Sequence, residues 1–454
     1  MDPDIPKDST TSHREPHHSL PGWLAVVLVV GTSAAVLVLE ILAARLLAPY
    51  VGVSLETYTG IIGTVLAGIA VGAWLGGAAA DRVDPRRLIP VLLVVGGALA
   101  IATVPTIRAL GGAGDASSVG VTLLLTAVGF LPSATVLSAI APAVVKLQLR
   151  DLHDTGATVG RLSAYGTAGA IVATFLTGFV LVAVAAVTTI IIATGVLLVV
   201  GGLALWATMP SDVRRASRTD VSSMSAFAGL ALLGAWALGS PCDSETTYYC
   251  VTIETDAARS GGQILVLDDL RHSYVDLDDP THLEFWYTRR LAEAIDLASS
   301  DRSVRAVHVG GGALTVPTWV QTTLPASRQT VFEIDDELIE LVVDEFDRAT
   351  GPGSGLDVVA GDARLSLRDV VDDSVDIVVG DAFGSRAVPW HLATEEFVDD
   401  VARVLRPGGI YAINVIDGAD LAFLRAETAT IASVFTHVEV VLGEGPAGGR
   451  SATR

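Results

Sequence analysis

The residues best suited to chemistry surround a run of three glycines in the second half of the chain. Val304–Thr315 reads as a buried strand that ends in Gly310, Gly311 and Gly312 and continues into a helix, and the next strand carries Glu333. Glycines let the backbone turn sharply and approach a ligand closely. Glu333 lies 21 residues after Gly312, about the spacing at which a carboxylate grips the hydroxyls of a ribose. This pattern predicts a site for a nucleoside-bearing cofactor.

Further acidic residues follow the later strands. Asp362 comes directly after the strand expected at 356–360, and Asp381 directly after the one at 375–380. A single aspartate in such a place is equally typical of a helix N-cap. The ordered set is more informative, because ligands of parallel sheets bind at the carboxyl ends of the strands.

The elements that must position these residues alternate between strand and helix. After a hairpin at 263–275 and a helix at 283–297, we expect strands near 304–309, 329–334, 356–360, 375–380, 409–415 and 437–442. This alternation predicts a doubly wound, Rossmann-like α/β fold. The residues after 442 read as glycine-rich and polar, so we expect the last strand of such a fold to be lacking.

Together these motifs resemble the nucleoside site of spermidine synthases, within the class I methyltransferase fold. Leu265-Val-Leu-Asp-Asp269 and Leu283-Glu-Phe-Trp-Tyr287 also resemble the strand and substrate gate of that family. The resemblance implies aminopropyl transfer from decarboxylated S-adenosylmethionine (or use of S-adenosylmethionine) to a polyamine. We expect no metal, because no second Cys or His pair has the spacing of a metal site. The resemblance assigns Glu333 to the ribose, Asp362 and Ala363 to the adenine, Gly310–Gly312 to the tail, Asp381 to catalysis, and Tyr274, Glu284 and Tyr287 to the gate.

Three positions depart from the family pattern. Ala313 replaces an aspartate that holds the aminopropyl amine, Gly384 replaces a second acid, and Thr288 replaces a histidine of the gate. An amine must lose a proton before it attacks, so a missing carboxylate weakens the expectation of catalysis. Two alternatives therefore stay open: a methyltransferase, and a membrane sensor or transporter that binds polyamine or nucleoside without turnover. Replacement groups could come from His272, Tyr274, Asp276, Asp278 and Asp279 of the gate loop, which equally reads as a solvated acidic loop. His391 could also face the acceptor pocket, or it could be structural.

Composition divides the chain into two parts. The sequence is 51% hydrophobic, and its mean hydropathy of +0.54 is too high for a soluble protein of this size. Residues 1–240 carry 13 acidic and 13 basic residues, so the whole net charge of −21 falls on the remainder, whose basic residues are all arginine. This acidity argues against a nucleic acid partner.

Seven apolar segments precede residue 241, and most reach the roughly 20 residues that cross a bilayer. They cover residues 22–48, 58–80, 88–110, 119–146, 163–184, 187–208 and 224–240. We therefore expect a multi-domain protein: a polar tail (1–21), a transmembrane α-helical bundle (22–240), a strand and gate segment (241–303) and a nucleoside-binding domain (304–454).

Basic residues predict how these segments cross the cell membrane. Alternate loops contain nearly all of them, which places the N-terminus in the cytoplasm. Seven crossings then put the acidic domain outside, whereas a seventh segment lying in the interface would keep it inside. Cys242 and Cys250 are either a disulfide, which favours the oxidising side, or two free thiols.

Two features of the apolar half have functional interpretations. Gly76–Arg87 resembles the loop signature of the major facilitator superfamily, and six segments would make half of such a transporter, which would have to form a homodimer. Glu40 and Arg45 on the first segment are either intramembrane functional charges or side chains that reach from the helix end to the interface.

Overall fold

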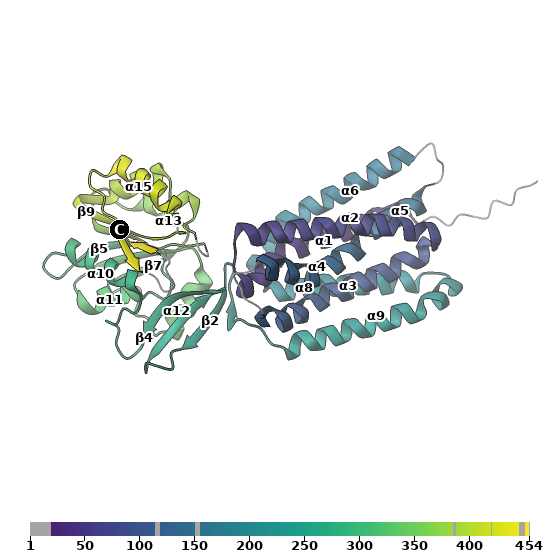
Figure 1. Ribbon diagram of the computed structural model, residues 1–454, viewed down its shortest axis with the longest axis horizontal. Helices are drawn as coiled ribbons and strands as arrows, with labels where there is room; N and C mark the ends of the chain where they lie inside the picture. Colours follow the sequence, from purple (N-terminus) through teal and green to yellow (C-terminus); the bar gives the residue numbers. More distant parts are fainter. Residues whose placement is uncertain are drawn as a thin grey trace, which may run out of the picture.

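A computed structural model describes residues 20–113, 119–149, 155–384, 387–418, 420–444 and 450–453. The predicted polar tail (1–21) lies almost wholly outside the described residues. The chain forms a long helical bundle with an α/β part at one end (Figure 1). A small antiparallel sheet lies between the two.

The bundle consists of long apolar helices. Among the described residues, seven helical stretches are long and apolar enough to cross a membrane. Their elements are α1 (Gly22–Val51), α2 (Leu55–Arg82), α3 (Pro85–Leu110), α4 (Val119–Ser138) with α5 (Ile140–Gln148), α6 (Thr155–Leu176) with α7 (Val182–Val184), α8 (Val187–Ala207) and α9 (Ser211–Ala237). The seventh stretch is longer than the predicted 224–240, because α9 begins in the polar residues from Ser211 onward.

Glycines allow α2 to pack closely against α4 and α5. A Cβ atom on Gly72 would lie 2.1 Å from the carbonyl oxygen of Thr135, and one on Gly76 would lie 2.4 Å from that of Ala139. No side chain larger than hydrogen fits at these two positions without moving backbone. At the end of α2, the Asp81 carboxylate pairs with Lys146 at 2.8 Å. The small residues and the charges of this segment therefore hold α2 against α4 and α5.

The small sheet begins directly after α9. Its strands, in spatial order, are β1 (Ser244–Glu245), β2 (Cys250–Thr255), β3 (Gly262–Leu267) and β4 (Leu270–Asp276), and all neighbours are antiparallel. β3 and β4 form the hairpin expected at 263–275. Cys242 and Cys250 are joined by a disulfide, which decides between the two states that the sequence left open and ties the linker after α9 to β2.

The large sheet has seven strands in the order β10-β11-β9-β8-β5-β6-β7. Its strands are β5 (Arg305–Val309), β6 (Arg328–Glu333), β7 (Leu356–Ala360), β8 (Val375–Gly380), β9 (Leu405–Ile416), β10 (Val441–Glu444) and β11 (Arg450–Thr453). β5 to β9 are parallel. The chain runs outward from β5 to β7 and then returns to β8 on the other side of β5. This reversal between β5 and β8 is the switch point at which such sheets bind ligands, and the predicted doubly wound fold is confirmed.

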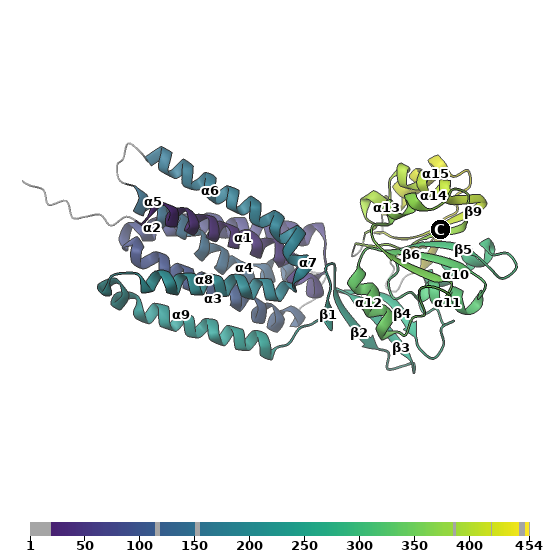
Figure 2. The ribbon, with the colours of Figure 1, turned by 180° about the vertical axis from the view of Figure 1, so that it is seen from behind.

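Helices cover both faces of the large sheet (Figure 2). α10 (Trp286–Ala298), α11 (Thr315–Thr323) and α12 (Asp336–Glu345) lie on one face, and α13 (Ala363–Ser366), α14 (Glu395–Val404) and α15 (Ala422–Val434) lie on the other. In β5 the side chains alternate: Ala306 packs with α10 and α11, whereas Val307 and Val309 pack with α14. Both faces are buried, which explains the nearly continuous apolar strands in the sequence.

The expectation that the last strand is lacking was wrong. β11 pairs antiparallel with both β9 and β10, between which it lies. It is only four residues long, with the sequence Arg-Ser-Ala-Thr. This sequence lacks the apolar alternation that usually marks a strand. The strand is recognised only from its pairing with β9 and β10.

Candidate nucleoside site

The glycine turn follows β5 at the switch point of the sheet. Gly310 has φ +95°, and a Cβ atom there would lie 2.5 Å from the carbonyl oxygen of Asp381. Gly312 has φ +48°, and its Cβ atom would lie 2.7 Å from the Ser273 hydroxyl oxygen. Both the left-handed backbone and the lack of space require glycine at these positions. The turn therefore packs directly against the end of β8 and against β4.

Glu333, at the end of β6, points back toward this turn. Its carboxylate accepts hydrogen bonds from the backbone N–H of Gly311 at 2.8 Å and of Asp335 at 3.2 Å. The side chain is almost fully buried. These two bonds fix the carboxylate at the place where the sequence pattern predicts a ribose-binding group.

A cavity of about 210 Å³ opens beside Glu333. Apolar and aromatic side chains form much of its wall, among them Tyr248, Tyr249, Phe332, Leu338 and Phe383. The predicted residues Gly310, Gly312, Glu333, Asp362, Ala363 and Asp381 also line it, whereas Gly311 lies in the adjoining smaller cavity. An apolar slot with one oriented carboxylate suits a flat base attached to a ribose.

Asp362 and Ala363 begin α13 at one wall of this cavity. The Asp362 carboxylate accepts a hydrogen bond from the Arg364 N–H at 2.8 Å, so it caps the helix as well as lining the cavity. Its Oδ1 also lies 3.6 Å from Nε2 of His391. His391 thus belongs to the wall of the nucleoside cavity, beside Asp362.

Asp381 lies where the larger cavity meets a smaller one of about 20 Å³. Although it is partly accessible from the cavities, the surrounding protein desolvates its carboxyl. This burial raises the pKa of Asp381 to about 7, against the opposing effect of hydrogen bonds from Asn414 and Tyr287. The Asn414 amide nitrogen donates to Oδ1 at 3.0 Å. Asp381 can therefore exchange a proton near neutral pH, as a general base must.

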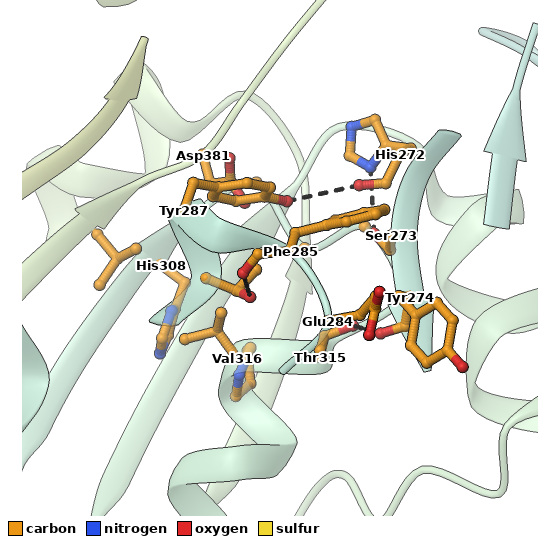
Figure 3. A pocket seen from close by; sticks show the side chains of 16 residues that line it. His272, Ser273, Tyr274, Glu284, Phe285, Tyr287, His308, Thr315, Val316 and Asp381 are labelled. Carbon is orange, nitrogen blue, oxygen red and sulfur yellow. Dashed lines mark hydrogen bonds between the residues drawn. The ribbon is translucent and has the colours of Figure 1, made fainter. Parts of the chain in front are cut away.

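The smaller cavity lies under the gate segment (Figure 3). Tyr287 lies beside Asp381, and its hydroxyl reaches the carbonyl oxygen of His272 at 3.5 Å. Phe285 stacks on Tyr287 with 6.0 Å between the ring centroids. His272 lines both cavities, and burial lowers its pKa to about 4, so its imidazole is neutral at pH 7. Its neutral ring can therefore accept or donate a hydrogen bond in the same two cavities that Asp381 lines.

The other two predicted gate residues, Glu284 and Tyr274, differ in whether their polar atoms face the small cavity. Glu284 lies at the edge, half-exposed, with Oε2 3.0 Å from His282 Nε2. Tyr274 is buried, but its hydroxyl points away from Asp381 and donates to Asp256 at 2.9 Å. The acidic loop is also committed elsewhere: Asp276 pairs with Arg259, and Asp278 accepts from Ser260 at 3.0 Å. Of the replacement groups that the sequence offered, His272, Tyr274 and His391 line the cavities, but the Tyr274 hydroxyl is bonded to Asp256.

The three residues that depart from the family pattern are uncharged, and none of them supplies a carboxylate or an imidazole to the cavities. Ala313 is fully buried among apolar residues of β2, β3 and α12. Gly384 lines the larger cavity without a side chain. The Thr288 hydroxyl is buried and donates to the Phe285 carbonyl oxygen at 2.8 Å.

Sequence reasoning missed Tyr248, Tyr249 and Asn414. The tyrosines lie in the turn between β1 and β2, where the hydroxyl of Tyr249 donates to the Phe383 carbonyl oxygen at 2.9 Å. Asn414 lies in β9 beside β8. The pair of adjacent tyrosines just before Cys250 was the one available signal. Among the described residues, no three His, Cys, Asp or Glu side chains are grouped to hold a metal ion.

Comparison with known proteins identifies relatives of the C-terminal half. No family model matches the chain. The chain is 26% identical over 151 residues to a probable polyamine aminopropyl transferase of Bifidobacterium longum, covering 33% of each protein. It is also 26% identical over 164 residues to a polyamine aminopropyltransferase of Vibrio vulnificus, covering 36% of this chain and 52% of that one. The chain thus spans between a third and about half of the lengths of these relatives.

Two solved structures are similar over more of their length. A spermidine synthase from Thermotoga maritima is 20% identical with a TM-score of 0.38, over 46% of this chain and 70% of that one. A probable spermidine synthase from Corynebacterium glutamicum is 30% identical with a TM-score of 0.43, over 47% of this chain and 80% of that one. The C-terminal half of the chain is therefore similar to polyamine aminopropyltransferases and spermidine synthases, as the motifs of the sequence predicted.

Proposed function

We propose that the protein is a membrane-anchored aminopropyltransferase that alkylates a polyamine with decarboxylated S-adenosylmethionine. One observation carries the proposal: Asp381 lines both the nucleoside cavity and the small cavity under the gate. A carboxylate at this junction can accept a proton from a nucleophile on one side while the electrophile lies on the other. The names of the relatives support the reaction class, and the seven apolar helices support a membrane location.

The residues of the larger cavity fit the nucleoside. Glu333 is held in place by two backbone N–H groups and would accept hydrogen bonds from the ribose hydroxyls, with the aromatic and aliphatic wall around the base. Asp362 and Ala363 would face the edge of the base. The glycine turn would lie along the tail, because Gly310 and Gly312 leave that side of the cavity without side chains.

The reaction would be a displacement at carbon. The sulfonium of the nucleoside supplies the leaving group. As an amine nitrogen attacks the adjacent carbon, a C–N bond forms, the C–S bond breaks with its electron pair on sulfur, and the products are 5′-methylthioadenosine and the lengthened amine. Asp381, with its pKa of about 7, takes the proton that the attacking nitrogen loses. Tyr287 and Asn414 orient the carboxyl through hydrogen bonds.

The gate has to open for a polyamine to enter. A space of about 20 Å³ holds little more than one water molecule. The stacked rings of Phe285 and Tyr287 line this space under the gate segment. Acceptor binding therefore requires displacement of these rings, which makes the gate the element that selects the amine.

Turnover by the full-length protein in lipid nanodiscs tests the proposal. With putrescine and decarboxylated S-adenosylmethionine we expect 5′-methylthioadenosine and spermidine in equal amounts, with a rate that rises through about pH 7. Asp381→Asn should reduce the rate by at least a hundredfold, as for loss of a general base, and leave nucleoside binding intact. Methylated amine from S-adenosylmethionine, without aminopropyl product, would instead identify a methyltransferase.

A second candidate function is a receptor that binds nucleoside or polyamine without turnover. The disulfide and the distribution of basic residues favour it, because together they favour an extracytoplasmic position for the acidic domain, away from a cofactor made in the cytosol. Calorimetry that detects 5′-methylthioadenosine or spermidine binding, in a preparation without turnover, would establish this function.

A further inference from the structure

The turn between β1 and β2 connects the helical bundle to the nucleoside cavity. This tyrosine turn, Thr246-Thr247-Tyr248-Tyr249, presents both of its rings to the larger cavity. The carbonyl oxygens of Thr246 and Thr247 face the bundle. The small sheet to which it belongs lies between the two parts of the molecule (Figure 1).

On the bundle side, Arg45 of α1 holds the turn. Its guanidinium donates to the carbonyl oxygen of Thr246 at 2.9 Å and also to that of Thr247. The two carbonyls are adjacent, so the planar fork of an arginine suits them better than a single ammonium would. Arg45 is only partly exposed, and its charge opposes the effect of burial on the pKa of Asp268, which burial raises. The side chain therefore belongs to the junction between bundle and small sheet.

Two further contacts keep the small sheet against the bundle. The Glu245 carboxylate accepts a hydrogen bond from the Val187 N–H at 3.0 Å, at the first turn of α8. A carboxylate there is also stabilised by the helix dipole. After α1, Gly52 has φ +68° and lies so close to Asp269 that a Cβ atom would be 2.7 Å from its Oδ1. Two of the three connections of the small sheet, β1–β2 and β3–β4, thus rest on the ends of α8 and α1.

On the cavity side, the tyrosine turn reaches the predicted ribose-binding carboxylate. The Thr246 hydroxyl donates to Oδ2 of Asp335 at 2.5 Å, and the Thr247 N–H donates to Glu337 at 2.5 Å. The Asp335 N–H in turn donates to Glu333 at 3.2 Å. Four residues are therefore linked in series: Arg45 bonds the Thr246 backbone carbonyl, the Thr246 hydroxyl bonds the Asp335 carboxylate, and the Asp335 backbone N–H bonds Glu333.

We infer that Arg45 is a positioning residue for the nucleoside site, so that the helical bundle is a structural part of that site. Arg45 sets the position of the tyrosine turn, which places the two tyrosine rings against the base and, through Asp335, orients Glu333 toward the ribose. The nucleoside probe in the test rests on the proposed function. The positioning itself does not, because the hydrogen bonds exist in the protein without ligand.

The test compares full-length variants in lipid nanodiscs by hydrogen–deuterium exchange and by 5′-methylthioadenosine affinity. Arg45→Ala should speed amide exchange in 244–250 and in 333–338, and weaken nucleoside binding by roughly tenfold, since two charge-assisted hydrogen bonds are lost. Arg45→Lys should restore part of the affinity. Arg87→Ala is the matched control, because Arg87 also donates to a backbone carbonyl, that of Ala216 at 2.5 Å, at the other end of the bundle.

A second variant covers the case in which Arg45→Ala does not fold. Thr246→Val keeps the size of the side chain and the carbonyl that Arg45 binds, but removes the bond to Asp335. It should weaken nucleoside binding in the same direction, and in the double variant the two losses should not add.

Faster exchange in both segments together with weaker binding would support the inference. Unchanged affinity in a folded Arg45→Ala protein, or faster exchange confined to 244–250, would overturn it. If the unmodified protein binds no nucleoside, the proposed function fails, and exchange in 333–338 alone decides whether Arg45 positions Glu333.

Discussion

Glu333 and Asp381 are carboxylates on the strands that flank β5, yet their surroundings give them different chemistry. Glu333 accepts two backbone N–H bonds, so its oxygens are oriented toward the cavity. Asp381 has one N–H donor from Asn414 and the Tyr287 hydroxyl, in a desolvated position that raises its pKa. The first environment suits a binding group, and the second suits a group that gains and loses a proton.

Replacing Glu333 tests the binding role. Glu333→Ala should weaken 5′-methylthioadenosine binding by at least about a hundredfold, because two hydrogen bonds of a charged group to the ribose, each of about 1.5–3 kcal/mol, are lost. Glu340→Ala removes the same charge from the exposed face of α12 and should leave the affinity unchanged. Calorimetry on both variants measures the difference. Equal affinities for Glu333→Ala and the unmodified protein would show that Glu333 does not contact the nucleoside.

The raised pKa of Asp381 predicts a pH-dependent stability. The pKa is about 7 in the folded protein and about 3.9 in an unfolded chain. Between these values the folded state binds more protons, so the contribution of Asp381 to stability falls as pH rises from about 4 to 7 and is constant above. Asp381→Asn removes this dependence. At pH 8 the variant should be the more stable by at most about 4 kcal/mol, and at pH 4 the two proteins should be equal.

Denaturant unfolding of both proteins at pH 4, 6 and 8 measures this difference. A stability difference that does not change with pH would mean that the Asp381 carboxyl ionises normally in the folded state.

At the scale of elements, the sequence was most informative where local chemistry decides the structure. The glycine turn, the β3–β4 hairpin and the apolar helices could be predicted, because positive φ, alternation and hydropathy are properties of short segments. The position of the tyrosine turn near Glu333 could not be predicted. It depends on a hydrogen bond from Thr246 to Asp335, which lies 89 residues away in the sequence. The start of α9 was missed because its first turns are polar, and β11 because its sequence Arg-Ser-Ala-Thr has no apolar alternation.

The gate segment offers a prediction at this scale. Phe285 stacks on Tyr287 over the small cavity, where about 20 Å³ is open. Phe285→Ala should enlarge this space and lower the KM for putrescine several-fold while changing kcat less, since the ring must otherwise move on binding. Leu297→Ala, at an exposed position of α10, is the matched control. A higher KM in Phe285→Ala would show instead that the ring forms part of the acceptor site.

At the scale of the whole molecule, basic and acidic residues are concentrated at opposite ends. Most basic residues of the helical part lie at the end of the bundle away from the α/β part, where Lys146 pairs with Asp81 and Arg87 lies near Asp220 (Figure 1). The acidic α/β part and the disulfide lie at the opposite end. If the bundle spans a bilayer, the excess of basic residues predicts that this end faces the cytoplasm, and an odd number of spans would then place the disulfide on the oxidising side.

We therefore expect the nucleoside-binding domain on the outer side of the cell membrane. An impermeant thiol reagent added to intact cells should label Cys242 and Cys250 only after an impermeant reductant has opened their disulfide. As a control, Ser211→Cys in a protein without the native cysteines places a thiol at the start of α9, which should react only after lysis. Labelling of Cys242 and Cys250 only after lysis would place the domain in the cytoplasm. The cytosolic nucleoside would then be within reach, and catalysis would be favoured over the receptor function.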